Sequence, residues 1–116
     1  MRNMTTYRVG LFAEWRARMY LRLRGYRIVK SRHITGRNTG RAEIDIVARR
    51  GNLLIFVEVK ARPNFDSGIR AITMRQNMRL RRAAETYISH TGWCGDARFD
   101  AIIVCGWRIY WLRGQL

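Results

Sequence analysis

Three acidic residues stand close together in the sequence, in the segments Glu43-Ile44-Asp45 and Phe56-Val57-Glu58-Val59-Lys60. The chain has 23 lysine and arginine residues but only 8 aspartate and glutamate residues. Carboxylates gathered in this way repel one another unless a cation joins them. In so basic a chain, the cluster predicts a site for a divalent cation and a reaction on a polyanionic substrate.

The formal net charge is +15. A charge of this size implies a polyanionic partner, with nucleic acid first and an anionic membrane surface or an acidic protein as alternatives. Almost all of the basic residues are arginines, and the only lysines are Lys30 and Lys60. Lys60 is therefore a rare lysine in an arginine-rich chain, and it stands beside the carboxylates.

The length and composition predict a single cytoplasmic domain over residues 1–116. A length of 116 residues and an apolar fraction of 47% are sufficient for one buried core. No run of eighteen apolar residues is present, so we expect no membrane span, and the N-terminus lacks a signal-peptide core. Cys94 and Cys105 form no CxxC pattern, which favours a reducing, intracellular location.

The hydrophobic pattern predicts an α/β fold in the order α-β-β-β-α-β-β. The first helix, from about Tyr7 to Arg24, has an apolar repeat of Phe12, Trp15, Met19 and Leu23. Residues Ser31 to Gly40 are expected to form a loop. The other elements are strands at Tyr26–Lys30, Glu43–Ala48, Leu53–Lys60, Phe99–Cys105 and Ile109–Leu112, and a helix at Ile72–His90. Leu53 to Val57 is apolar on both faces, as in a central strand covered on both sides.

Gly51-Asn52 lies between two apolar runs and predicts a two-residue hairpin turn. In that register Asp45 lies opposite Glu58, and Glu43 lies opposite Lys60. Directly opposite residues share a face, so all four side chains would point the same way. A slip of one residue would remove this arrangement.

Two interpretations of this hairpin remain open. Asp45 and Glu58, with the backbone carbonyl of Val59, offer hard oxygen ligands for Mg²⁺ or Mn²⁺. Lys60 would then position or deprotonate a water, or offset charge on a phosphate. In the alternative, the same residues form an ordinary cross-strand salt-bridge cluster, with Glu43 paired to Lys60 and Asp45 paired to a nearby arginine.

The order of these segments resembles the small bacterial YraN-like family of endonuclease-like proteins, within the PD-(D/E)XK nuclease superfamily. The resemblance spans about Arg8 to Leu112. Its blocks are Ala13-Glu14, Tyr20-Leu21, Gly25-Tyr26-Arg27-Ile28, Ala42-Glu43-Ile44-Asp45-Ile46, Phe56-Val57-Glu58-Val59-Lys60-Ala61-Arg62, Arg81-Arg82-Ala83-Ala84 and Arg98-Phe99-Asp100. It implies a restriction-endonuclease-like αβββαβ core, with a mixed central sheet flanked by two helices.

The resemblance also implies roles for individual residues. Asp45 and Glu58 would be metal ligands, Lys60 would be catalytic, and Glu14 would reach the same site from the first helix. The chain departs from the family pattern at Ala42, where glycine is usual. It departs again at Gln76-Asn77, where Lys-Gln is usual; Gln76 retains the capacity to form hydrogen bonds.

Several arginines are candidates for contact with phosphates. Arg41 and Arg62 flank the hairpin motifs, and Arg75, Arg79 and Arg82 follow one face of the second helix. A solvated helix face is the alternative for the last three. Three tryptophans are able to stack on bases: Trp93, Trp107 and Trp111. Their positions in or beside predicted strands favour packing in the core instead.

The leading hypothesis is a Mg²⁺-dependent endonuclease that hydrolyses DNA phosphodiester bonds, with branched or single-stranded DNA as substrate. A homodimer would let two sites address two strands. The first alternative is a non-catalytic nucleic-acid-binding module with a nuclease fold. The second is a basic adaptor for an acidic protein.

Overall fold

The computed structural model describes residues 2–35 and 42–114. The elements in these ranges are α1 (Arg2–Leu23), β1 (Arg27–Thr35), β2 (Ala42–Arg50), β3 (Leu53–Ala61), α2 (Phe65–Ala71), α3 (Met74–Thr91), β4 (Asp96–Cys105) and β5 (Arg108–Leu112). The α/β class and the αβββαβ order are confirmed, with α2 as an additional short helix. No helix in the described ranges is long and apolar enough to cross a membrane.

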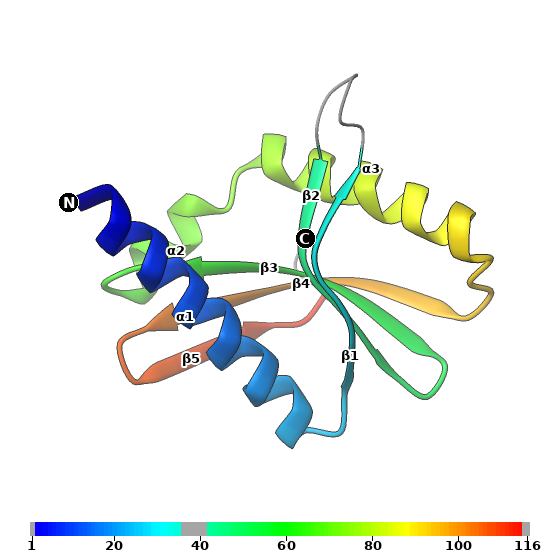
Figure 1. Ribbon diagram of the computed structural model, residues 1–116, viewed down its shortest axis with the longest axis horizontal. Helices are drawn as coiled ribbons and strands as arrows, with labels where there is room; N and C mark the ends of the chain where they lie inside the picture. Colours follow the sequence, from blue (N-terminus) through cyan, green and yellow to red (C-terminus); the bar gives the residue numbers. More distant parts are fainter. Residues whose placement is uncertain (1, 36–41, 115–116) are drawn as a thin grey trace.

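The five strands form one mixed sheet in the order β1-β2-β3-β4-β5. Only β3 and β4 are parallel among the neighbouring pairs. A parallel pair needs a crossover connection, and α2 with α3 supply it. α1 covers one face of the sheet and α3 covers the other (Figure 1).

β3 is the central strand, as its apolar sequence predicted. Ile55 and Val57 pack in the cluster that includes α1, whereas Leu54 and Phe56 pack in the cluster that includes α3. All four side chains are almost fully buried. The strand is therefore held by both layers of helix, which fixes the position of the residues that follow at its carboxyl end.

α1 buries a different face from the one its large apolar residues suggested. Ala13, Ala17 and Leu21 pack on the sheet, while Phe12 is 60% exposed and Leu23 is 80% exposed. The two small alanines let the helix backbone approach the sheet closely. The apolar repeat that contains Phe12 therefore does not mark the buried face, and large apolar side chains remain on the surface.

The predicted loop at Ser31–Gly40 is wrong over its first half, because β1 continues to Thr35. Backbone pairing with β2 extends the strand as far as Thr35 opposite Ala42. The register shifts between Ile28 and Lys30, and Arg32 has a φ of +53°. Both features bend the hairpin formed by β1 and β2.

The connection after β3 contains a helix, α2, that the hydrophobic pattern did not predict. Asn64 caps α2 by accepting a hydrogen bond from the Ser67 backbone N–H, and Asp66 lies in its first turn. Thr73 then caps α3, which ends at Thr91 with Gly92 as its C-cap, one residue beyond the predicted end at His90. An N-cap residue followed by an acidic first turn was the available signal for α2.

Two tryptophans near the C-terminus have opposite environments. Trp111 is partly buried, and its indole N–H donates to the fully buried Asp100 carboxylate at 2.9 Å. Trp107 lies in the turn between β4 and β5 and is 96% exposed. The expectation that it packs in the core is therefore wrong.

Candidate functional site

The β2–β3 hairpin opens into a fork at its end away from the turn. The predicted register is confirmed from Arg50 opposite Leu53 to Ile46 opposite Val57, and the pairing ends there. Beyond this point β2 pairs only with β1. The expectation that the ladder continues to Asp45 and Glu43 is wrong, because the bent β1–β2 arm leaves the sheet (Figure 1).

Asp45 lies at the point where the two strands separate. Its Oδ2 accepts a hydrogen bond from the backbone N–H of Val59 at 2.8 Å. In an extended strand the N–H and C=O of one residue point to the same side, so the Val59 carbonyl also faces the fork. A carboxylate and a backbone oxygen from separate strands are thereby brought together.

The electrostatic environment of Asp45 disfavours its ionised form. Burial is the largest cause, and the negative charge of Glu58 is the second. The hydrogen bond from Val59 opposes them, while the charges of Glu14 and Glu43 add to them. Together they raise the pKa of Asp45 to about 7. A bound cation would relieve this cost.

Glu58 and Lys60 are two residues apart on β3 and form an ion pair, with 3.1 Å between Oε1 and Nζ. Both side chains are largely buried. The salt-bridge alternative paired Lys60 with Glu43, and the observed partner is Glu58 instead. The pair holds an ammonium group beside the carboxylates.

A cavity of about 370 Å³ opens on the α3 side of the fork. It is lined by Glu43, Asp45, Glu58, Gln76 and Arg79. The side-chain oxygen of Gln76 is buried, and within the described ranges it has no hydrogen-bond partner. A buried oxygen without a donor is a position for a water or a cation.

Glu14 reaches the fork from α1 and is held by an arginine from β1. The side chain is 10% exposed, and its two oxygens accept from Nε and Nη2 of Arg32 at 2.9 and 3.0 Å. Glu14 does not line the cavity, although its charge affects Asp45. Residue types alone did not indicate the role of Arg32, because its approach to Glu14 depends on the bent backbone of β1.

The five candidate arginines are dispersed. Arg79 lines the cavity, and Arg62 lies at the end of β3, where its Nη1 donates to the Ala61 carbonyl. Arg75 and Arg82 are exposed on α3, outside the lining of the cavity. Arg41 lies outside the described residues.

The oxygen donors at the fork suit a hard divalent cation. They are the carboxylates of Asp45 and Glu58, the carbonyl of Val59 and the amide oxygen of Gln76. No group of three or more His, Cys, Asp and Glu side chains able to hold a metal is found in residues 2–35 and 42–114. A cation here would therefore be held by two carboxylates and neutral oxygens, the set that Mg²⁺ accepts together with water.

The fold and the fork define an α/β protein with a restriction-endonuclease-like core. The chain belongs to Uncharacterised protein family UPF0102, whose sequence pattern matches residues 13–104. The expected membership of the YraN-like family is thereby confirmed.

Similar proteins support this assignment over most of the chain. A UPF0102 protein of Paramagnetospirillum magneticum is 42% identical over 110 residues, which cover 92% of this chain and 84% of that protein. A UPF0102 protein of Sinorhizobium medicae is 44% identical over 101 residues, covering 85% and 80%. A relative from Bradyrhizobium diazoefficiens is 42% identical, covering 88% and 75%.

Proposed function

We propose that this protein is a metal-dependent endonuclease that hydrolyses phosphodiester bonds in DNA. The observation that carries the proposal is the Asp45 carboxylate, held at the fork beside Glu58 and Lys60 with its pKa raised to about 7. Titratable groups perturbed by burial and by specific neighbours, in a cavity, are typical of functional sites. The resemblance to the nuclease superfamily implies roles for the same three residues.

The metal would be Mg²⁺ or Mn²⁺, held by Asp45, Glu58 and the Val59 carbonyl. When bound, it would supply charge stabilisation for the phosphate and lower the pKa of a water. Lys60 keeps Glu58 oriented through their ion pair and presents a positive charge to a phosphate oxygen. The hydrogen bond from Val59 fixes the orientation of Asp45.

DNA is the proposed substrate because the net charge of +15 favours a polyanion. Arg79 places one guanidinium in the lining of the cavity. A chain of this size offers little surface for sequence readout, so branched or single-stranded DNA is proposed rather than a specific duplex site. A cytoplasmic location and a homodimer that addresses two strands belong to the same proposal.

The decisive experiment is Mg²⁺- and Mn²⁺-dependent cleavage of a panel of duplex, flapped, branched and single-stranded DNA. We expect wild-type protein to cleave at least one of them, and Asp45→Asn, Glu58→Gln and Lys60→Met to lose about a hundredfold or more. Lys30→Met is a matched control, because Lys30 is the other lysine and is exposed. Equal residual cleavage by wild type and Lys60→Met would sink the proposal.

A nucleic-acid-binding module without turnover is the second candidate. It is favoured by the internal pairing of the acidic groups, since Glu14 is held by Arg32 and Glu58 by Lys60. Binding of the DNA panel by a wild-type protein that cleaves none of its members would support this module. Failure to bind DNA even at low salt would instead favour an adaptor for an acidic protein.

A further inference from the structure

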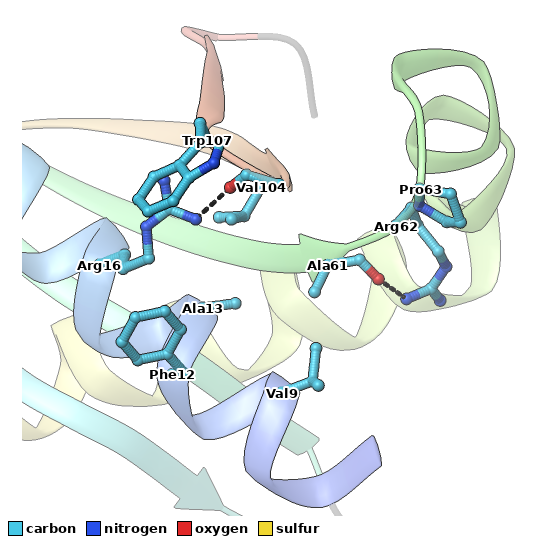
Figure 2. Close-up of a pocket in the computed structure, with 10 residues that line it drawn as sticks. Val9, Phe12, Ala13, Arg16, Ala61, Arg62, Pro63, Val104 and Trp107 are labelled. Atoms are coloured by element: carbon cyan, nitrogen blue, oxygen red, sulfur yellow. Dashed lines mark hydrogen bonds between the residues drawn. The ribbon is translucent and has the colours of Figure 1, made fainter. Parts of the chain in front are cut away.

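A second cavity, of about 460 Å³, lies between the first half of α1 and the ends of β3 and β4. Its lining includes Val9, Phe12, Pro63, Val104 and Trp107 (Figure 2). It is mainly apolar, unlike the cavity at the fork. We call it the aromatic groove.

Large aromatic rings remain exposed in and beside this groove. Trp107 is 96% exposed and Phe12 is 60% exposed. Trp15 stacks on Phe12, with 5.8 Å between ring centroids and an interplanar angle of 16°. Clustered aromatic surface of this kind marks a binding site more often than isolated apolar residues do.

The charged groups of the groove are both positive. Its described lining contains Arg16 and Arg62 and no aspartate or glutamate. Arg16 is fixed in place, because it donates to the Gly106 carbonyl and its guanidinium lies 5.9 Å from the centre of the Phe12 ring. Figure 2 shows its side chain between Phe12 and Trp107. The groove therefore combines flat apolar rings with ordered cations.

The groove adjoins the candidate site through the chain itself. Ala13, in its lining, precedes Glu14, and Ala61 follows Lys60 at the end of β3. Alternation along β3 turns Ala61 toward α1 and Glu58 toward α3. A strand of nucleic acid that occupies both the fork and the groove would therefore pass the carboxyl end of β3. A second copy of this chain is disfavoured as the occupant, because each copy carries a net charge of +15.

We propose that the aromatic groove binds the unpaired bases of single-stranded nucleic acid beside the fork. Bases stack on aromatic side chains without sequence preference, while arginines contact the backbone. Paired bases within a duplex do not present their faces, so the groove would select single-stranded or flapped substrates. This inference rests on the proposed function, since it names the substrate class of the same site.

The test is equilibrium binding in EDTA, with fluorescently labelled oligothymidylate of about 15 nucleotides, a length within the range of known single-strand sites. A blunt duplex and an abasic oligonucleotide of equal length supply the same phosphates without accessible bases. We expect oligothymidylate to bind about tenfold or more tightly than the abasic strand. Because cleavage is not measured, the result is independent of catalysis.

Variants at the most exposed ring make the test specific. We expect Trp107→Ala and Trp107→Leu to lose about tenfold in affinity for oligothymidylate, and Trp107→Phe to retain most of it. Folding should be unaffected because the side chain is 96% exposed. Leu23→Ala is the control, because Leu23 is an exposed apolar residue at the other end of α1.

Full affinity in Trp107→Ala, full affinity in Trp107→Leu, or equal binding of the abasic strand would each overturn the proposal. If binding depends on Trp107 but the protein never cleaves DNA, only the proposed endonuclease activity is overturned. If the protein cleaves DNA but its binding does not depend on Trp107, only the proposed binding of bases in the aromatic groove is overturned. The two proposals therefore fail separately.

Discussion

The carboxylate of Asp45 accepts a hydrogen bond from the backbone N–H of Val59, across the fork between β2 and β3. In a continued ladder that N–H would meet a backbone carbonyl of the neighbouring strand. The side chain of Asp45 replaces that acceptor and ends the ladder. The same contact holds the carboxylate where burial and neighbouring acidic groups raise its pKa to about 7.

The first prediction concerns the pH dependence of stability. Below pH 3.8 Asp45 is protonated in both the folded and the unfolded state. Its contribution to the free energy of unfolding is then fully present. As the pH rises to about 7, unfolded Asp45 ionises while folded Asp45 keeps its proton. Stability should therefore fall by about 1.4 kcal/mol per pH unit through this window.

Asp45→Asn removes this titration and keeps an oxygen for the Val59 N–H. In metal-free urea titrations, we expect the variant to gain on the order of 2–4 kcal/mol relative to wild type between pH 4 and pH 8. The exposed Asp66→Asn is the control and should follow wild type. Parallel curves for Asp45→Asn and wild type would contradict the raised pKa.

The second prediction concerns the Arg32–Glu14 pair. Arg32→Ala leaves the Glu14 carboxylate, on a side chain that is 10% exposed, without its two charged donors. We expect a loss of about 1–3 kcal/mol in the free energy of unfolding. Glu14→Gln in the same background should recover part of it, since a neutral amide is cheaper to bury. Arg27→Ala, at an exposed position on the same strand, should change stability by less than about 0.5 kcal/mol.

The backbone at Arg32 gives this prediction a second measurement. Its φ of +53° suits glycine better than other residues. Arg32→Gly should therefore be more stable than Arg32→Ala by about 1 kcal/mol, although both lack the ion pair. Thermal unfolding of the two variants compares them directly, and a less stable glycine variant would contradict the backbone argument.

The third prediction compares two helical glycines. A Cβ at Gly68 would lie 2.3 Å from Cγ2 of Ile103, whereas one at Gly10 meets nothing within 4 Å. Gly68→Ala should lose about 1–3 kcal/mol, because α2 must move away from β4. Gly10→Ala should gain about 0.5–1 kcal/mol from helix propensity alone. Chemical denaturation checks both, and equal effects at the two sites would contradict the packing of α2.

The sequence predicted the order of helices and strands along the chain and the turn-proximal register because both depend on local signals. Gly51-Asn52 and the apolar runs around it determine the pairing of Ile46 with Val57. The fork was missed because the extrapolated register assumed a continuous ladder. The register shift after Ile28 and the positive φ of Arg32 bend β1 and β2 away, and neither leaves a pattern in the residue types.

The covered face of α1 was missed for a different reason. Periodicity weights large apolar residues such as Phe12, whereas close packing on the sheet selected Ala13 and Ala17. The candidate site was predicted more closely than the covered face of α1. One cavity is lined by residues that include those chosen from spacing and resemblance: Glu43, Asp45, Glu58, Gln76 and Arg79. Their role in catalysis stays a prediction.

The last prediction concerns Gln76, whose buried oxygen lacks a hydrogen-bond partner in the described ranges. Gln76→Met removes that oxygen and keeps a long, flexible side chain. In EDTA we expect stability to be unchanged or higher by about 1 kcal/mol, because an unpaired polar group is lost. Mg²⁺ should stabilise wild-type protein by about 1.4 kcal/mol at ten times its Kd, and should stabilise the variant less if the amide oxygen contributes to the cation site.

Thermal unfolding across a Mg²⁺ titration measures both effects in one experiment. Asn77→Met is the matched control, because it removes an amide from the next residue of α3, which does not line the cavity. Glu58→Gln sets the expected lower limit for the response to Mg²⁺. Equal Mg²⁺ stabilisation of Gln76→Met and wild type would show that the amide oxygen is not a ligand. Absence of stabilisation in wild type at high Mg²⁺ would count against the cation site as a whole, since a ligand that binds only the folded state must raise its stability.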